Sequence, residues 1–380
     1  MRRLMSEEVA KGTVARPSRS WGLLGAGRVQ FQSHDRDGHA THGSRLLSAA
    51  LLVGWLLVVP SVHAQGEASV KVDAGTERVI ERALKYLATH QSPNGSWLGR
   101  NEKERHYPIA ITAYALMAFQ SAGHLPGEGE YGRQVSLGVQ YLLNSVSPEG
   151  LIGDKDSGQY MYFHGIATIA LAELYGQTSS RAIRPKLARL IKIIVSSQNK
   201  DGGWRYRPVS SDSDISVTVL QVVALRAAKN SGLNVPQGTI DDAVRYVRSC
   251  FSEGSGGFSY QPRGKPGFAR TAAAIYSLQV CGRYDDPLVL RGSKYLFENF
   301  GDAQRWFTYG NFYAAPAQYM IGGETWKKWY EKVRALLLER VHNDGEVSLW
   351  FGNTVGPTYE TSVNVMILAM PYQYIPLYQR

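Results

Sequence analysis

The chain has 380 residues, 44% of them hydrophobic, and a formal net charge of +10. The first 64 residues hold 8 basic and 4 acidic side chains, so the other 316 carry only +6, without a basic run of the kind that binds nucleic acid. A nucleic-acid partner is therefore not expected. A chain of this length can bury one large core or two smaller ones.

Residues 45–64 have the three parts of a secretory signal peptide. A basic flank precedes an apolar run at 46–59, and small residues at 60–64 supply a cleavage site. The run is shorter than the about 20 apolar residues that span a membrane. We predict cleavage near Ala64 and export, to a bacterial periplasm or the extracellular space. Residues 1–44 are interpreted as a non-native or disordered extension and residues 65–74 as a linker.

The remaining sequence alternates two kinds of helical run. Val79–His90 repeats apolar residues at spacings of three and four, which predicts an amphipathic outer helix. Ile109–Phe119 is apolar on nearly every side, so it predicts an inner helix that is buried all round. Further inner runs, rich in small residues, are His164–Leu174, Ser216–Leu225, Thr271–Leu278, Phe312–Met320 and Thr361–Leu368.

A glycine turn joins each outer run to the next inner run. The two best copies read Gln-x-x-[Asn/Asp]-Gly-x-Trp, and their defining residues are Gln91, Gly95, Trp97, Gln198, Gly202 and Trp204. Weaker copies centre on Gly150, Gly256, Gly301 and Gly345, so successive glycines lie 44 to 55 residues apart. Such a period indicates a helical-hairpin repeat. Six hairpins that close into a ring leave no apolar face unpaired, and we therefore predict an all-α fold, an α/α toroid (α6/α6 barrel) of twelve helices over residues 75–380.

The turn resembles the repeat of squalene cyclases and protein prenyltransferase β subunits, and the resemblance extends over the whole mature chain. It implies that each glutamine and tryptophan of the turn, Gln91 with Trp97 and Gln198 with Trp204, stack and hydrogen-bond across neighbouring repeats. The resemblance specifies the fold more than the reaction, because the same toroid carries unrelated functions. The glycine–tryptophan turn speaks against a toroid that acts on polysaccharides.

The two cysteines decide against a zinc prenyltransferase. Those enzymes are expected to hold zinc through Asp-x-Cys and a later His, and neither Cys250 nor Cys281 follows that pattern. No metal and no cofactor are predicted. Cys250 ends the fourth outer run and Cys281 ends the fourth inner run, at opposite ends of a hairpin and about 16 Å apart along its axis. A disulfide needs Cα atoms within about 7 Å, so both thiols should be unbridged.

In a toroid, the loops that lead into the inner helices converge at one mouth of a central cavity. Their residues are strongly aromatic and include both charge signs, namely His106, Tyr107, Tyr160, Tyr162, His164, Tyr206, Phe268, Arg270, Tyr309, Tyr313, Tyr359 and Glu360. An aromatic wall with a few polar groups is typical of a site for an apolar ligand. We predict an apolar or isoprenoid-like small molecule as partner, compatible with peripheral membrane contact. The competing interpretation is that these side chains only fill the mouth and cap the loops. No protein partner can be named.

Asp212-Ser-Asp214-Ile-Ser216 is the strongest catalytic candidate. Class II terpene cyclases have Asp-x-Asp-Asp in a similar place, and the resemblance implies that Asp214 is the acid of a proton-initiated isomerase, with Asp212 beside it. Ile215 stands where the third acid should be. The competing interpretation is that Asp214 caps the following helix. Arg270 could bind an anionic group, pair with either aspartate, or lie at the rim. A non-catalytic protein-interaction toroid is the remaining alternative.

Overall fold

The structure, a computed structural model, describes residues 70–98, 102–301, 306–352 and 355–378. The predicted extension and signal peptide lie outside these residues, and their assignments stay predictions. Within the described part of the chain, no helix has the length and apolar character needed to cross a membrane.

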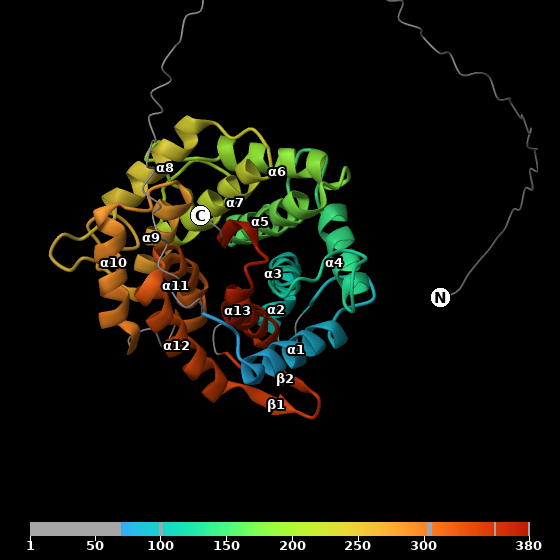
Figure 1. Ribbon diagram of the computed structural model, residues 1–380. Coiled ribbons are helices and arrows are strands. Elements are labelled where there is room, and N and C mark those ends of the chain that lie inside the picture. Colours follow the sequence, from blue (N-terminus) through green and yellow to red (C-terminus); the bar gives the residue numbers. More distant parts are fainter. Residues whose placement is uncertain (1–69, 99–101, 302–305, 353–354, 379–380) are drawn as a thin grey trace, which may run out of the picture. The chain divides into compact units, whose positions relative to one another are not determined.

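Twelve of the described helices form two concentric rings (Figure 1). The outer ring contains α1 (Ala74–Thr89), α4 (Gly132–Asn144), α6 (Ile183–Ser196), α8 (Gln237–Ser249), α10 (Pro287–Glu298) and α12 (Gly323–Arg340). The inner ring contains α3 (Pro108–Ser121), α5 (Tyr160–Thr178), α7 (Ile215–Asn230), α9 (Phe268–Val280), α11 (Phe307–Ile321) and α13 (Pro357–Ala369). Smaller elements are α2 (Glu102–Arg105), the antiparallel strands β1 (His342–Asp344) and β2 (Val347–Leu349), and the 3₁₀ turns η2 (Met370–Tyr372) and η3 (Pro376–Tyr378).

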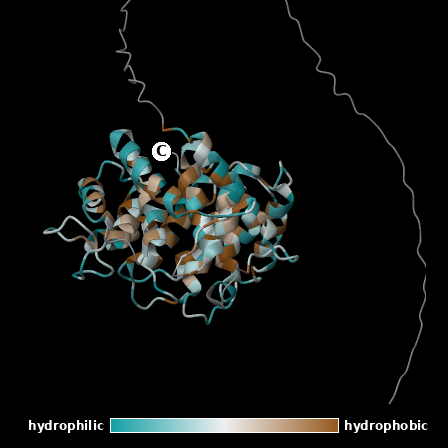
Figure 2. Cartoon of the chain, turned by 90° about the horizontal axis from the view of Figure 1, so that it is seen from below, coloured by the Kyte–Doolittle hydropathy of each residue, from teal (hydrophilic) through white to brown (hydrophobic). Residues whose placement is uncertain are grey.

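The inner helices make a closed ring. Each contacts the inner helix before it and the one after it, and α13 returns to α3. Nearly all of their residues are buried, whereas each outer helix buries one face. Figure 2 shows the same division, with hydrophobic residues concentrated inside the ring. The predicted α/α toroid of six helical hairpins is confirmed.

The glutamine of each well-formed turn links two repeats. Gln91 Nε2 donates to the carbonyl oxygen of Gly95 at 3.0 Å and to that of Gln134, in the next outer helix, at 2.8 Å. Gln198 makes the same two kinds of bond, at 2.8 and 2.9 Å. Gly202 adopts φ 96°, and a Cβ there would lie 2.0 Å from a carbonyl oxygen of α8. Only glycine allows this close approach of the turn to the neighbouring outer helix.

The tryptophans bind within their own repeat. Trp97 and Trp204 are 0% and 1% exposed, and each indole N–H donates at 2.7 Å to a carbonyl oxygen of the preceding outer helix. Because an indole has a single N–H, the expected tryptophan bond across repeats is wrong. In the fifth repeat, Trp306 is 47% exposed and takes a different place. In the sixth, Trp350 is the buried counterpart, and its indole N–H donates to the Leu337 carbonyl oxygen at 2.8 Å.

Contacts between the first and last repeats close the ring. Helix α1 packs against β2 and α13. Arg82 of α1 donates to the carbonyl oxygens of Gly345 and Val347, at 2.6 and 3.2 Å. Ion pairs join Arg334 of α12 to Asp73 and Lys85 to Glu346.

The described part of the C-terminal segment, residues 370–378, docks on the ring. It crosses the middle of the toroid in Figure 1, and η3 contacts α5, α7 and α11. Ile375, Leu377 and Tyr378 are buried, and the Leu377 N–H donates to the Glu173 carboxylate of α5 at 3.1 Å. The segment therefore covers several inner helices at once.

Both cysteines are free, as predicted. Burial raises the pKa of Cys250 to about 11 and that of Cys281 to about 12, so both thiols stay protonated.

Candidate functional site

A cavity of about 540 Å³ opens among the N-terminal ends of the inner helices. Six of the predicted ligand-binding residues line it: Tyr107, Tyr162, Tyr206, Arg270, Tyr309 and Tyr359. The lining also includes residues that the sequence did not single out for this site, among them Tyr114, Gln159, Phe163, Ser216, Tyr260 and Trp306. Aromatic rings from all six repeats thus face one space. The volume lies within the range of small-molecule sites.

Four of the seven tyrosines in the described cavity lining use their hydroxyl groups for hydrogen bonds within the protein. Tyr206 and Tyr260 share a hydrogen bond of 2.5 Å between their hydroxyls, and the Tyr162 hydroxyl lies 2.6 Å from Ser216 Oγ. Tyr309 donates to the Ser216 carbonyl oxygen at 3.3 Å. Burial raises the pKa of Tyr162, Tyr260 and Tyr309, so all three remain neutral. What remains for a ligand is mainly the faces and edges of the rings.

Arg270 supplies the charge of this cavity. Among the described residues that line it, none is Asp, Glu, His, Lys or Cys. Its Nη1 donates to the Lys265 carbonyl oxygen at 3.1 Å, and no ion pair involves it within the described part of the chain. The surrounding loop, residues 254–270, contains Arg263 and Lys265 but no acidic residue. Of the three alternatives for Arg270, pairing with Asp212 or Asp214 is therefore not found, because both aspartates pair with Arg205.

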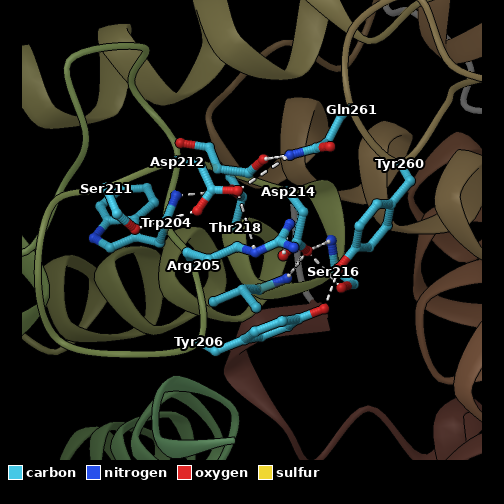
Figure 3. A network of polar contacts seen from close by, with 12 residues as sticks. Trp204, Arg205, Tyr206, Ser211, Asp212, Asp214, Ser216, Thr218, Tyr260 and Gln261 are labelled. Atoms are coloured by element: carbon cyan, nitrogen blue, oxygen red, sulfur yellow. Dashed lines mark hydrogen bonds and ion pairs between the residues drawn. The ribbon is translucent and has the colours of Figure 1, made fainter. Parts of the chain in front are cut away.

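Asp214 is a helix cap and does not line the cavity (Figure 3). Its carboxylate is fully buried, and Oδ1 accepts from the backbone N–H groups of Ser216 and Val217, at 2.8 and 2.9 Å, and from the Ser216 hydroxyl at 2.6 Å. Oδ2 pairs with Arg205 Nη1 at 3.0 Å. Asp212 is half-exposed and pairs with Arg205 Nε at 3.5 Å. Of the two interpretations of Asp214, the structure shows the helix cap, which turns the carboxylate into the protein.

Burial raises the pKa of Asp214 above its ordinary value, and the donated hydrogen bonds and Arg205 act in the opposite direction. The cap alone would predict a lowered pKa, but desolvation is the larger effect at this fully enclosed position. A raised pKa does not make this carboxyl an acid for the cavity, since its oxygens are occupied by protein donors.

Tyr160 and His164 form a buried structural pair away from the cavity lining. His164 Nε2 lies 3.1 Å from the Leu190 carbonyl oxygen, and burial lowers the pKa of His164 to about 4. The neutral ring therefore donates from Nε2 and accepts at Nδ1 from the Tyr160 hydroxyl, 3.0 Å away. That hydroxyl also accepts from the Ile152 N–H at 3.1 Å. Their predicted place at the mouth is wrong.

Glu360 accepts a hydrogen bond from the Thr308 hydroxyl, and burial raises its pKa to about 7. Tyr313 is fully buried behind Tyr309, with ring centroids 5.1 Å apart. His106 is exposed. None of these three belongs to the cavity lining, contrary to prediction.

Tyr260, which was not among the predicted site residues, could have been found from the sequence. Tyr260 stands two residues after Phe258, as Tyr206 stands two residues after Trp204. The backbone N–H of Phe258 donates to Thr271 Oγ1 at 2.9 Å, as that of Trp204 does to Thr218 Oγ1 at 3.1 Å. Aligning the weak fourth turn with the third would have placed Tyr260 beside Tyr206.

No family model matches the chain, and no curated protein matches it. Solved structures do. A cellobiose 2-epimerase from Spirochaeta thermophila matches with a TM-score of 0.60 and 11% identity, over 79% of this chain and 96% of the epimerase. An inactive α-1,6-mannanase variant from Salegentibacter sp., in complex with α-1,6-mannotriose, matches with a TM-score of 0.56 and 8% identity, over 79% and 99%. The Candida albicans protein geranylgeranyltransferase-I complexed with GGPP matches with a TM-score of 0.50 and 13% identity, over 78% and 97%.

These neighbours are toroid enzymes of different chemistry. At such low identity the likeness establishes the architecture only. The chain is an α/α toroid, similar in fold to sugar epimerases, mannanases and a prenyltransferase.

Proposed function

We propose that this protein binds an amphipathic small molecule, with an apolar, isoprenoid-like body in the aromatic cavity and an anionic group at Arg270. The observation that carries the proposal is the composition of the wall. Four of its tyrosines, Tyr162, Tyr206, Tyr260 and Tyr309, use their hydroxyls for bonds within the protein, which leaves mainly their rings for a ligand. Its one charged side chain, Arg270, lacks an acidic partner among the described residues. A buried or half-buried guanidinium without a carboxylate is well suited to a carboxylate or phosphate ligand.

Binding without turnover is favoured over catalysis. General acid–base chemistry needs a titratable group within hydrogen-bond reach of the ligand. The described lining residues include no carboxyl, imidazole, amine or thiol, and burial raises the pKa of the lining residues Tyr162, Tyr260 and Tyr309, so these phenols stay protonated and cannot serve as bases. Asp214, the acid of the cyclase alternative, is enclosed as a helix cap and paired with Arg205. We therefore propose that this protein shares with the squalene cyclases the fold and an apolar type of ligand, but not the cyclisation reaction.

Calorimetric titration tests the proposal. Dodecyl phosphate and dodecanoate, each below its micelle concentration, should bind, and dodecyltrimethylammonium, with the same chain and a cationic head, should bind more weakly. Arg270→Gln should lower affinity for the two anions about tenfold or more, the size expected for a hydrogen bond to a charged group. Arg263→Gln, an exposed arginine of the same loop, is the matched control.

Two results would contradict the proposal. If none of these amphiphiles binds, the cavity tyrosines only fill the mouth, and the protein-interaction toroid becomes the better interpretation. If they bind but Arg270→Gln has no effect, the assigned anionic subsite is wrong. Asp214→Asn, which keeps a capping side chain, should leave binding measurable, whereas a cyclase that depends on this acid would lose all turnover.

Export and peripheral membrane contact are proposed as the setting of this function. The loops on the cavity side expose large apolar side chains, namely Leu98, Val209, Trp306 and Phe351, which are 41% to 68% exposed. An amphipathic ligand partitions into membranes, so apolar loops around the cavity mouth favour exchange at a lipid surface. Cosedimentation with phosphatidylcholine vesicles, compared between the wild type and Phe351→Ser, checks this expectation. Equal amounts in the supernatant with and without vesicles would refute it.

A further inference from the structure

The Asp212-Ser-Asp214 segment has a role in the wall of the cavity. Three of the cavity tyrosines, Tyr162, Tyr206 and Tyr260, come from α5 and from the loops before α7 and α9. They therefore belong to three different repeats. In Figure 3, Tyr206 lies below the Arg205–Asp214 pair and Tyr260 to its right, and the hydroxyls of the two tyrosines meet.

The backbones of the two loop tyrosines are fixed by neighbouring inner helices. The Tyr206 carbonyl oxygen accepts from the Met161 N–H at 2.9 Å, and the Tyr260 carbonyl oxygen accepts from the Ile215 N–H at 3.0 Å. Each bond anchors a loop to the first turn of the preceding repeat's inner helix. These backbone bonds do not determine in which direction the side-chain rings of Tyr206 and Tyr260 point.

Arg205 sets that direction. Its Cζ lies 4.5 Å from the centroid of the Tyr206 ring and 5.5 Å from that of Tyr260. A guanidinium over an aromatic ring is attracted by the electron-rich face. The guanidinium thus contacts both tyrosine rings and holds them next to each other in the cavity wall. In this position their hydroxyls share a hydrogen bond.

Asp214 in turn fixes Arg205 and the third tyrosine. The two oxygens of its carboxylate have different partners. Oδ1 accepts hydrogen bonds from the backbone N–H at the helix terminus and from the Ser216 hydroxyl, and Oδ2 pairs with Arg205. Because the Ser216 hydroxyl donates to Asp214, its oxygen is free to accept from the Tyr162 hydroxyl. One buried carboxylate thus orients aromatic groups from three repeats.

We infer that Arg205, held by Asp214 and Asp212, is a positioning residue that sets the shape of the cavity wall and thereby selects ligands by the shape of their apolar body. The inference rests on the proposed function, because it assigns selectivity to the same cavity. It gives the Asp-x-Asp segment a structural task in recognition instead of proton donation.

The test compares two probes with the same head group, farnesyl phosphate and dodecyl phosphate, so that the contribution of Arg270 cancels. Arg205→Met should change the ratio of their dissociation constants about fivefold, the effect of losing one partly buried cation–π contact. Arg205→Lys keeps the charge and should restore part of the ratio. Arg207→Met, two residues away and exposed, should leave the ratio at the wild-type value.

A second measurement does not need a ligand. In protein labelled with 3-fluorotyrosine, the ¹⁹F resonances of Tyr206 and Tyr260, assigned by Tyr→Phe variants, should move or broaden in Arg205→Met and stay in place in Arg207→Met. If Arg205→Met fails to fold because it leaves Asp214 buried without its partner, Arg205→Met/Asp214→Asn removes the pair together and retains the cap.

The two ideas fail in different ways. If neither probe binds the wild type, the proposed function fails and the selectivity role fails with it, whatever the resonances show. If the probes bind but their ratio is unchanged in Arg205→Met, or the two resonances do not respond, the positioning role is overturned while the binding function stands.

Discussion

Replacing Glu173 by Gln should remove a large part of the pH dependence of this protein's stability. Glu173 lies on α5, is 2% exposed and accepts one hydrogen bond, from the Leu377 N–H of the C-terminal segment. Burial raises its pKa from the ordinary 4.5 to about 7. Tyr276 and Tyr378 are the titratable neighbours, and burial also raises their pKa values, so they stay neutral while Glu173 titrates.

The sign follows from the raised pKa. The folded protein binds the proton of Glu173 more tightly than the unfolded chain does. The stability that Glu173 contributes is therefore fully present below pH 4.5 and is lost as the pH rises through about 7. The difference between the two pKa values corresponds to about 3 kcal/mol. In a toroid of about 300 residues, that lowers Tm by about 5 °C. Glu360, whose pKa burial raises to about 7, acts in the same direction, whereas His164, whose pKa burial lowers to about 4, acts in the opposite direction below pH 6.5. The contribution of Glu173 is therefore read from the difference between Glu173→Gln and the wild type.

Thermal unfolding at pH 5 and pH 8.5 measures the effect. Glu173→Gln keeps an oxygen for the Leu377 N–H but has no charge to bury, so its Tm should fall much less between the two pH values. Glu339→Gln, at an exposed position of α12, is the control and should behave as the wild type does. After correction for the base-catalysed rise of intrinsic exchange, the protection of the amides of residues 370–378 should fall between pH 5 and pH 8.5 in the wild type and in Glu339→Gln, and should not fall in Glu173→Gln. Equal losses of Tm in Glu173→Gln and wild type would refute the reasoning.

Three further outcomes are expected. Trp97→Ala or Trp204→Ala should each lower the free energy of unfolding by about 3–5 kcal/mol, measured with denaturant, since both rings are buried; a change below about 1 kcal/mol would contradict their role in the repeat. Gly202→Ala should cost at least about 2 kcal/mol in the same assay, because it combines a left-handed φ of 96° with a close contact to α8. Thiol titration should find Cys250 and Cys281 unreactive in the folded protein and both reactive in denaturant, and a bridged pair in denaturant would overturn the helix pairing.

The hairpin architecture was predictable because it depends on patterns local to each repeat. Amphipathic outer runs, apolar inner runs and the glycine turn at Gly202 are each visible within about 20 residues, and each agrees with the others. The positions of Trp306 and Trp350 were not predictable from the sequence, because the number of residues between the turn glycine and the tryptophan differs from that of the two best copies. Trp306 and Trp350 each follow a turn glycine by five residues, yet the first is 47% exposed and the second is buried, so the spacing does not tell which one is buried.

The site was predictable to the level of the loop and not of the side chain. Tyr160 and His164 are four residues apart on α5 and share a face, whereas Tyr162 lies between them on the other side. The sequence could not tell which face looks into the cavity. Asp214 was ambiguous for a different reason, because an acid and a cap have the same sequence pattern. Its pairing with Arg205, nine residues earlier, decides the matter.

The contacts that join α1 to β2 and α13 restrict how relatives of this protein can differ in length. An open solenoid gains or loses units at its ends, because each unit touches only its neighbours. Here the first and last units are also neighbours, through Arg82 and the carbonyl oxygens of β2 and its turn. Deleting one hairpin would leave Arg82 facing the wrong partner and open a gap that no other unit fills. A closed ring therefore accommodates changes of length in the loops at its two faces, and the loops on the cavity side are the ones that shape the proposed ligand site.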